Sequence, residues 1–389
     1  MTTPCIVGWA HTPFGKHSDQ SVESLVVRVA GEAMDHAGIG PDDVDEIVLG
    51  HFNAGFSAQD FTAALVLQAD DALRFKPTTR VENACATGSA AVHQGLKSIR
   101  AGASKVVLVV GVEQMTTTPP KEIGQNLLKA SYLKEDGDTP AGFAGVFGKI
   151  ADLYFQRHGD QTDALAAIAA KNHRNGVDNP FAQMRKDLGE EFCRTESEKN
   201  PRVAGPLKRT DCSLVSDGAA ALVLTDTDTA LRMKRAVAFR GEAHAQDFLP
   251  MSKRDILQFE GCSVAWKRAL EKAGVTLGDL SFVETHDCFT IAELIEYEAM
   301  GLAKPGEGGA LARSGELAAD GRLPVNRSGG LKAKGHPIGA TGVSMHALSA
   351  MQLCGEAGDM QLNAPKLAGI YNMGGAAVAN YVSILERLR

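Results

Sequence analysis

The segment "CATGSAAVHQGLKSIRAG" (85–102) has an altered second copy, "GATGVSMHALSAMQLCG" (339–355). The Ala-Thr-Gly triplets of the two copies align at an offset of 254 residues. An apolar, strand-like run follows each copy, "KVVLVV" in the first case and "KLAGIYN" in the second. Each copy therefore predicts a helix followed by a strand, the alternation that is typical of α/β folds.

A second pair of related segments lies outside the first pair. "AMDHAGIGPDDVDEIVLGHF" (33–52) and "ALEKAGVTLGDLSFVETHDCF" (269–289) both contain a helix ending in Ala-Gly, an acidic turn and a strand. Chance similarity of alanine-rich helix ends is the alternative for either pair alone. Because both pairs occur in the same order, we expect two similar halves that arose by duplication.

The composition changes between the two halves. "TTTPPKEIGQNLLKASYLKEDGDTPAGFAG" is rich in Gly, Pro and Thr, and the stretch after it is polar and charged. Long insertions of this kind are commonly lids or binding loops. We therefore expect an N-terminal half at 1–115 and 206–235, an inserted loop domain at 116–205 and a C-terminal half at 236–389.

Composition and charge narrow the functional classes. The 389 residues are 44% hydrophobic and 22% charged, and 40 basic against 47 acidic residues give a net charge of −7. This balance argues against nucleic-acid binding. The N-terminus does not resemble a secretory signal, no apolar run approaches membrane-spanning length, and the C-terminal "ERLR" is not a peroxisomal address. The seven cysteines are scattered, without a Cys-x-x-Cys pair, so we expect reduced thiols, no metal site, no integral membrane association and a cytoplasmic location.

Cys85 is the first candidate for chemistry because it immediately precedes the helix predicted from Ala86 onward. The unpaired N–H groups and the dipole of a helix N-terminus favour a thiolate and should lower the pKa of this thiol. A nucleophilic role is predicted on that basis. A small cysteine that only fills the core is the alternative.

A nucleophilic thiol needs a base, and His336 in "NRSGGLKAKGHPIGATG" (326–342) is the candidate. Gly335 and Pro337 hold it in a turn before the helix that matches the one after Cys85. If the halves pack about a pseudo-twofold axis, the two helix starts face each other. His336 and Cys85 should then be close, whereas a solvated loop histidine is the alternative.

A further pair of candidates, His286 and Cys288, follows the strand-like "SFVE" in "VETHDCFTIAELIEYEAMGL" (283–302). The ends of strands are where α/β folds place their sites. A buried, hydrogen-bonded histidine and a packing cysteine are the alternatives. Gly374 and Gly375 in "GIYNMGGAAVANYVSIL" (369–385) allow a close backbone approach, so their N–H groups can face an oxyanion, although a tight turn between strands would also explain them.

Together these motifs resemble the thiolase superfamily, and within it the sterol-carrier-protein type, over essentially the whole chain. The similarity is carried by "NACATGSAAV", "KNHRNGVDNPFAQ", "SDGAAALVL", "HDCF", "GGLKAKGHPIGATG" and "NMGGAA", which occur in this order.

The resemblance implies a five-layered α-β-α-β-α fold of two like halves, a loop domain that binds coenzyme A, a homodimer, and acyl transfer between acyl-CoA and acetyl-CoA in lipid metabolism. Coenzyme A and acyl-CoA are then substrates, and no cofactor is expected. By the same resemblance Cys85 takes the acyl group, and His336 activates it and helps to bind the thioester oxygen. The Cys85 amide and Gly374 hold the oxyanion of the acyl-enzyme.

The chain departs from many thiolases at Asn372, where they carry the cysteine that acts as acid and base. The sterol-carrier type carries this thiol in its His-Asp-Cys-Phe motif, which makes Cys288 the acid/base. His286 then replaces the asparagine that holds a water in the oxyanion site of many relatives. Claisen chemistry needs an enolate stabilised by donors, for which His286 and His336 are available.

Acyl transfer by a thiolase has three alternatives. They are a thiolase-like aldolase or lyase that acts on CoA-linked side-chain adducts, a non-catalytic acyl-CoA or lipid-binding protein, and a condensing enzyme of the ketoacyl-synthase type. The retention of Cys85, His336 and Cys288 argues against the first alternative, and the retention of both thiols and both histidines argues against the second. Condensing enzymes of the third kind lack the pairing of "GHPIGATG" with "HDCF" that this chain has. The sequence leaves the acyl chain, the direction of the reaction and the CoA contacts open, and among the basic residues of the insertion (Lys171, Arg174, Arg185 and Lys186) it singles out none.

Overall fold

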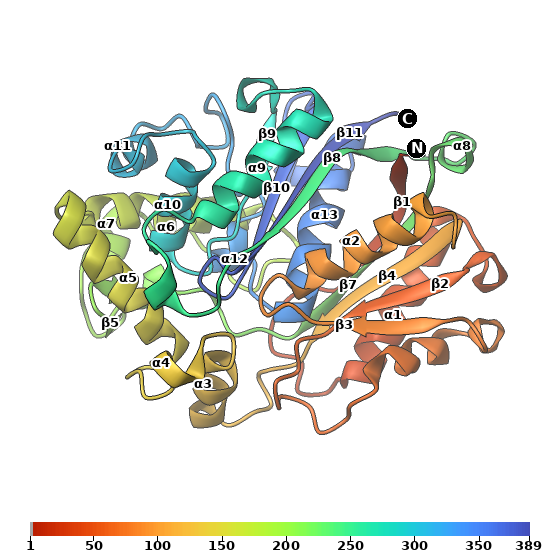
Figure 1. Cartoon of the computed structure of the whole chain (residues 1–389), viewed down its shortest axis with the longest axis horizontal. Coiled ribbons are helices and arrows are strands. Elements are labelled where there is room, and N and C mark those ends of the chain that lie inside the picture. Colours follow the sequence, from red (N-terminus) through yellow and green to blue (C-terminus); the bar gives the residue numbers. More distant parts are fainter. Residues whose placement is uncertain (1–2) are drawn as a thin grey trace.

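The computed structural model describes residues 3–389, and one long mixed sheet runs through it (Figure 1). The order of its strands is β3-β2-β4-β7-β1-β8-β11-β10-β9. Their bounds are β1 Pro4–His11, β2 Glu46–Gly50, β3 Thr78–Val81, β4 Val106–Glu113, β7 Gly218–Asp226, β8 Val237–Gln246, β9 Phe282–Glu284, β10 Leu367–Gly374 and β11 Ala379–Arg387.

The sheet consists of two topological copies that meet between β1 and β8, where only Cys5–Ala238 and Ile6–Val237 pair. In the first copy β2 is parallel to β3 and β4, and β7 is antiparallel to both β4 and β1. In the second copy β9 is parallel to β10, and β11 is antiparallel to both β10 and β8. A parallel bridge between Val283 and Val325 takes the place of β3. This repetition confirms the predicted duplication.

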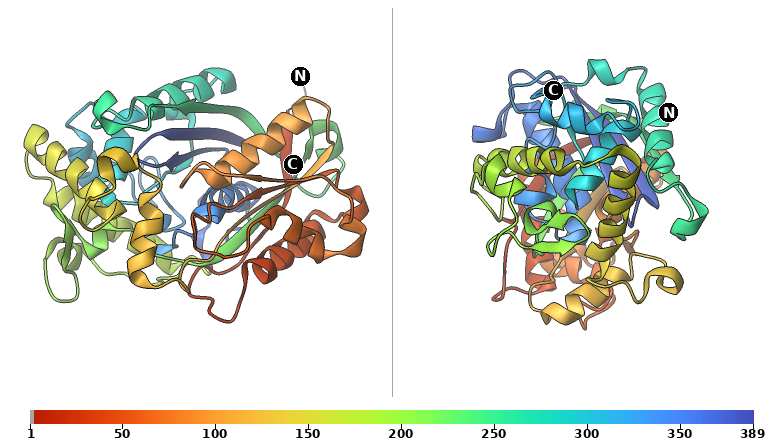
Figure 2. Two further views of the ribbon diagram at one scale, coloured as in Figure 1. Left: turned by 60° about the horizontal axis from the view of Figure 1, so that its bottom comes forward. Right: turned by 90° about the vertical axis from the view of Figure 1, so that its left-hand side faces the viewer.

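Helices separate and cover the two parts of the sheet. On one outer face α1 (Val22–Ala37) packs on the first copy, and on the other outer face α9 (Glu260–Ala273) packs on the second. Between the copies lie α2 (Thr87–Arg100) and α13 (Ile338–Cys354), which share a core with strands of both (Figure 2). The order helix, sheet, helices, sheet, helix is the predicted five-layered α-β-α-β-α architecture.

The outer helix α1 is amphipathic, as a helix that covers a sheet should be. Val22, Leu25, Val26 and Val29 lie on its buried face, and Gly38 ends it in the left-handed conformation. The central helix α13 is different because it is buried around its whole circumference. Its apolar, nearly uncharged sequence therefore reflects its position between two sheets.

The two central helices pack backbone against backbone at their first turns. A Cβ atom at Gly88 would lie 2.7 Å from the amide nitrogens of Gly342 and Val343, and one at Gly342 would overlap Ser89. The repeated Ala-Thr-Gly triplets thus remove side chains where the duplicated helices meet. Because of this close approach, the residues just before the two helices, Cys85 and His336, are brought to one place.

The segment between β4 and β7 forms a layer at one end of the molecule, together with helices of the C-terminal part (Figure 2). α6 contacts α10, α11 and α12. The elements concerned are α3 Pro120–Leu128, α4 Leu133–Asp136, α5 Phe143–His158, α6 Thr162–Val177, α7 Glu190–Arg194, β5 Arg202–Ala204, β6 Leu207–Lys208, α10 Thr290–Ala299, α11 Gly308–Arg313 and α12 Gly330–Ala333, while the short α8 Thr227–Ala230 follows β7.

Within residues 3–389, no helix combines the length and apolar character that crossing a bilayer would require.

Candidate active site

Cys85 lies in a tight turn between β3 and α2. Ala86 donates its N–H to the carbonyl of Asn83 at 3.1 Å, and the Thr87 hydroxyl donates to the carbonyl of Ala84 at 2.6 Å. Ala84 is held at a φ of 48°, a conformation that a non-glycine residue adopts only when its surroundings impose it. The turn therefore holds the thiol in one place, where it is 4% exposed and lines a cavity.

The acidity of Cys85 differs from the sequence-based expectation. Burial raises the pKa of its thiol to about 12, although a hydrogen bond from the Gly375 backbone acts to lower it. The helix N-terminus thus does not overcome the loss of solvation. In the resting site the residue is a neutral thiol, and it needs a base to become a nucleophile.

His336 is fixed by the turn before α13. Its backbone N–H donates to the Ser216 hydroxyl at 3.0 Å, and Gly335 before it has a φ of 110°. Its Nδ1 lies 2.7 Å from the Thr341 hydroxyl, which in turn lies 3.0 Å from the Pro337 carbonyl. Burial lowers the pKa of His336 to about 3, so the ring is uncharged near neutral pH. A neutral imidazole is the form that can accept a proton from a thiol.

His286 and Cys288 follow β9 directly. The backbone N–H of His286 donates to the Glu296 carboxylate at 3.1 Å, and its Nδ1 lies 2.9 Å from Nδ2 of Asn372 on β10. Burial, with His336 next in effect, lowers the pKa of His286 well below 6.5. Burial, followed by the proximity of Cys85, raises the pKa of Cys288 well above 9. Both side chains are therefore neutral in the resting site.

Cys85 lies more than 200 residues before His286, Cys288 and His336 in the chain, yet these side chains form one cluster. The sulfur of Cys85 and one ring nitrogen each of His286 and His336 lie within 4.8 Å of one another. The imidazole rings meet edge to face, with their centroids 5.1 Å apart. Cys288 lines the same cavity as Cys85 and His336. A thiol and two imidazoles at this spacing could also hold a metal ion, and they are the one such group among residues 3–389.

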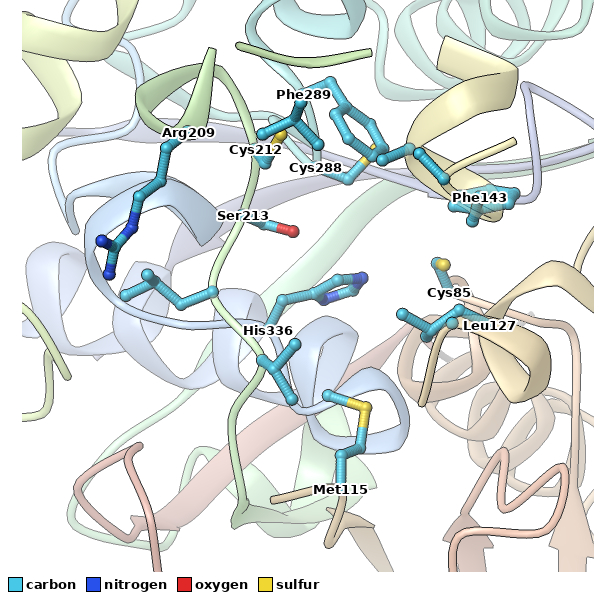
Figure 3. Close-up of a pocket in the computed structure, with 16 residues that line it drawn as sticks. Cys85, Met115, Leu127, Phe143, Arg209, Cys212, Ser213, Cys288, Phe289 and His336 are labelled. Atoms are coloured by element: carbon cyan, nitrogen blue, oxygen red, sulfur yellow. The ribbon is translucent and has the colours of Figure 1, made fainter. Parts of the chain in front are cut away.

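The cavity has a volume of about 300 Å³ and is mostly apolar. Figure 3 shows Cys85 and Arg209 on opposite sides of His336, with Phe289 and Cys288 on one wall and Met115 on the other. Phe143 and Ala144 of α5 line it, so the "GFAGVFGKIADLYFQRHG" segment contributes an apolar wall. The lining residues are Cys85, Met115, Gly124, Leu127, Ala141, Phe143, Ala144, Val203, Arg209, Cys212, Ser213, Leu214, Val215, Cys288, Phe289 and His336.

Asp287, between the two reactive side chains, ties their loop to neighbouring elements. Its carboxylate accepts hydrogen bonds from the Leu331 N–H at 2.6 Å, from the Lys332 N–H at 3.2 Å and from Asn172 Nδ2 at 2.7 Å. A Cβ at Gly330 would overlap this carboxylate, so only glycine fits there. Through Asp287, the α6 motif "KNHRN" holds the His286–Cys288 loop against the segment that leads to His336.

Gly374 is the last residue of β10 and Gly375 follows it, and it is the Gly375 backbone that acts to lower the pKa of Cys85. Gly374 is equally intolerant of a side chain, since its Cβ would overlap the Asn83 carbonyl. The sequence motif identified the pair but not which N–H group approaches the thiol.

The basic residues of the insertion considered at the sequence level do not line the cavity. Lys171 is partly buried and pairs with Glu293 at 2.9 Å, and Arg174 pairs with Asp187 at 3.4 Å. Arg185 lines a separate cavity beside Asp178. Arg209, which sequence reasoning missed, is the cation that borders the reactive cavity. Nothing in its local sequence distinguishes it from neighbouring Lys208, which is buried against Asp211.

Comparison with known families and proteins gives a consistent result. The family model "Thiolase, N-terminal domain" matches residues 5–228, and the model "Thiolase C-terminal domain-like" matches residues 241–387. The chain is 33% identical to the acetyl-CoA acetyltransferase of Methanothermobacter thermautotrophicus over 100% of both chains. It is also 33% identical to human sterol carrier protein 2, over 78% of this chain and 57% of that protein.

Among solved structures, the one titled "Ltp2-ChsH2(DUF35) aldolase" superposes with a TM-score of 0.84. The match covers 100% of this chain and 98% of that one, with 21% sequence identity. At this identity the similarity concerns the fold only.

Proposed function

The chain belongs to the thiolase family, and from this premise we propose that it transfers an acyl group reversibly between acyl-CoA and acetyl-CoA through a Cys85 acyl-enzyme. One observation carries the proposal. A thiol and two neutral imidazoles converge within 4.8 Å, and a second thiol, Cys288, lines the same cavity. This set provides a nucleophile, a base, an oxyanion donor and a separate acid/base.

In the direction of thiolysis, the first step is the activation of Cys85. His336 takes the thiol proton on its unpaired ring nitrogen, and the thiolate attacks the 3-keto carbon of the substrate. The pKa of Cys85 in the resting site, about 12, makes this base necessary. The amides of Cys85 and of the Gly374–Gly375 pair are proposed to hold the alkoxide that forms at C3.

The second step breaks the carbon–carbon bond. The acyl group stays on Cys85, and the bonding electrons pass to acetyl-CoA as an enolate. His286 and the now protonated His336 stabilise the enolate oxygen. Cys288 then gives its proton to the α-carbon, which yields acetyl-CoA and a Cys288 thiolate.

The second half-reaction restores the site. The Cys288 thiolate takes the proton of incoming coenzyme A, whose thiolate attacks the acyl group on Cys85. Cys85 leaves as a thiolate and recovers its proton from His336. The synthetic direction runs through the same steps in reverse.

We further propose that the segment 116–205 and the turn after β6 bind coenzyme A, with Arg209 next to its phosphates. Arg209 borders the cavity across from Cys85, it is exposed, and its guanidinium forms no ion pair with any residue in 3–389. An unpaired guanidinium matches phosphate geometry well.

Arg209→Gln is expected to raise the KM for coenzyme A about tenfold, equivalent to about 1.4 kcal/mol of binding, with kcat within about twofold. The matched control is Arg202→Gln, because Arg202 is exposed nearby but pairs with Glu196 at 3.0 Å. Initial rates of thiolysis against coenzyme A concentration measure both variants. Equal KM values for the two variants would place the phosphates elsewhere.

We also propose a homodimer in the cytoplasm that acts in lipid metabolism. Among the described residues 3–389, strand β3 pairs only with β2, so its other edge is available for a second copy about a twofold axis. All seven cysteines are free thiols, two of which the proposed chemistry requires. Reduced cysteines suit a reducing compartment.

A direct test follows the enol absorbance of acetoacetyl-CoA. We expect the absorbance to fall only when free coenzyme A is added, with two acetyl-CoA formed for each acetoacetyl-CoA consumed. Loss without coenzyme A, or release of an aldehyde or ketone from a side-chain adduct, would favour the aldolase alternative. The absence of any turnover across a panel of 3-ketoacyl-CoA chain lengths would leave only the binding-protein alternative.

A further inference from the structure

Asn372 lies in the middle of the cluster, on β10, and contributes no acid or base. It is buried, and its Nδ2 atom is 3.2 Å from the carbonyl oxygen of Cys85 and 2.9 Å from Nδ1 of His286. Many thiolases carry their acid/base cysteine at this position. The amide of Asn372 cannot act as an acid or a base, so it must have a different role here.

The hydrogen bonds of Asn372 determine the protonation pattern of His286. A carbonyl oxygen only accepts hydrogen bonds, so the side-chain atom facing the Cys85 carbonyl must be the amide nitrogen. That nitrogen only donates, so Nδ1 of His286 must be the acceptor. In a neutral imidazole the single proton then resides on Nε2.

Nε2 of His286 is a buried donor that no other group in residues 3–389 satisfies. Buried polar groups are nearly always paired, so an unpaired one in a reactive cluster points to a substrate atom. With its proton, Nε2 can donate to the enolate oxygen. The other tautomer would direct a lone pair at that oxygen and repel it.

The neighbouring imidazole is held in the opposite tautomer. The hydroxyl of Thr341 has one proton, which it donates to the Pro337 carbonyl, so it accepts from Nδ1–H of His336. Nε2 of His336 therefore carries a lone pair, and it too is buried without a partner in the described chain. Two imidazoles whose rings are 5.1 Å apart thus present a donor and an acceptor to the same cavity.

We infer that Asn372 is a positioning residue that holds His286 in the Nε2–H tautomer, and so makes it the enolate donor while His336 remains the base. This inference rests on the proposed thiolase function. It also explains why an amide suits this position once the acid/base role has moved to Cys288. A side chain without an N–H donor would leave the tautomer of His286 unspecified.

The tautomer can be measured independently of activity. In protein labelled with ¹⁵N at its 11 histidines, His286 is assigned by the signal missing from His286→Gln. We expect the wild-type signal to show a protonated Nε2 and an unprotonated Nδ1, and Asn372→Leu to lose this preference. A wild-type ring protonated on Nδ1 would overturn the inference, whatever reaction the enzyme catalyses.

Kinetics test the consequence of the tautomer. In Asn372→Leu and Asn372→Ala we expect kcat for condensation to fall about 10²-fold, the usual cost of losing one oxyanion donor, with KM changed less than threefold. Acylation of Cys85 by acetyl-CoA should remain detectable by mass spectrometry. The matched control is Asn380→Ala on the adjacent strand β11, where a buried asparagine accepts from the Tyr371 hydroxyl at 2.7 Å and donates to backbone carbonyls rather than to either imidazole. An equal loss of kcat in that variant would reduce Asn372 to a structural role.

Asn372→Asp provides a pH signature. A carboxylate accepts from Nδ1–H, so Nε2 then carries a proton only while the ring is an imidazolium. The condensation rate of this variant should fall as pH rises through the pKa of that ring, a limb that Asn372→Ala should not show. Identical pH profiles for the two variants would contradict the assigned geometry.

Discussion

Replacing Cys85 with serine is expected to lower the rate of CoA-dependent cleavage of acetoacetyl-CoA by at least ~10³-fold, because acyl transfer through an acyl-enzyme requires a nucleophile at this position. An alcohol is a far weaker acid than a thiol. His336, whose pKa burial lowers to about 3, is already a weak base for the Cys85 thiol in its neutral state. It cannot deprotonate an alcohol at a useful rate.

Two measurements make this result specific. Mass spectrometry after incubation with acetyl-CoA should show an acetyl group on Cys85 in the wild type and none in the variant. The control, Cys354→Ser, replaces a free thiol at the end of α13 that does not line the cavity, and its rate should stay within about twofold of wild type. A Cys85→Ser protein with the full rate would exclude a covalent intermediate on this residue.

Replacing Cys288 with alanine is expected to slow the exchange of the acetyl-CoA methyl protons with deuterated solvent by at least ~10²-fold, in the range usual for loss of a general acid or base. The thiol lines the cavity beside Cys85, where it can reach the α-carbon of a bound thioester. No other side chain of the cluster is proposed to move this proton, since Asn372 stands where many relatives have a cysteine.

The Cys288→Ala variant should separate the two halves of the chemistry. The attack of Cys85 on a thioester uses His336 as its base, so acylation of Cys85 should still be detected by mass spectrometry. Exchange is followed by the loss of the methyl signal in proton NMR. If acylation disappears together with exchange, the two cysteines do not divide the reaction as proposed.

Much of the fold could be predicted from local patterns. The first pair of similar segments, 33–52 and 269–289, forms the end of α1 with β2 and the end of α9 with β9. The second pair, 85–102 and 339–355, forms α2 and α13. Periodicity and turn residues are local signals, so a single sequence displays them directly. The five-layered architecture was expected from the resemblance to thiolases. The placement of α2 and α13 between the two copies of the sheet confirms it.

The site could be predicted in part for the same reason. Cys85, His286, Cys288 and His336 stand at strand ends and helix starts marked by glycine and proline, and the structure brings them to one cavity or cluster. Arg209 had no such mark. Its position at the border of the cavity depends on how the turn after β6 packs across from Cys85, and no local sequence pattern indicates this packing.

The acidity of Cys85 shows where local reasoning failed. A helix N-terminus does favour a thiolate, but the burial of the thiol between the two halves outweighs this effect and raises its pKa. Burial depends on residues hundreds of positions away, including His286, Cys288 and His336, which lie beside the thiol.

By itself, then, the amino-acid sequence determined the α/β alternation, the duplication and the candidates for the reactive side chains, because periodicity, turn chemistry and motif order are properties of neighbouring residues. Only the tertiary structure decided the hydrogen-bond partner of each imidazole, and with it which ring we propose to give a proton and which to take one. That choice depends on whether a ring nitrogen meets the amide of Asn372, 86 residues from His286, or the hydroxyl of Thr341, and on the water excluded around both. Hydrogen-bond partners and solvation in a buried site are set by the packing of distant segments, so they exist only once the chain has folded.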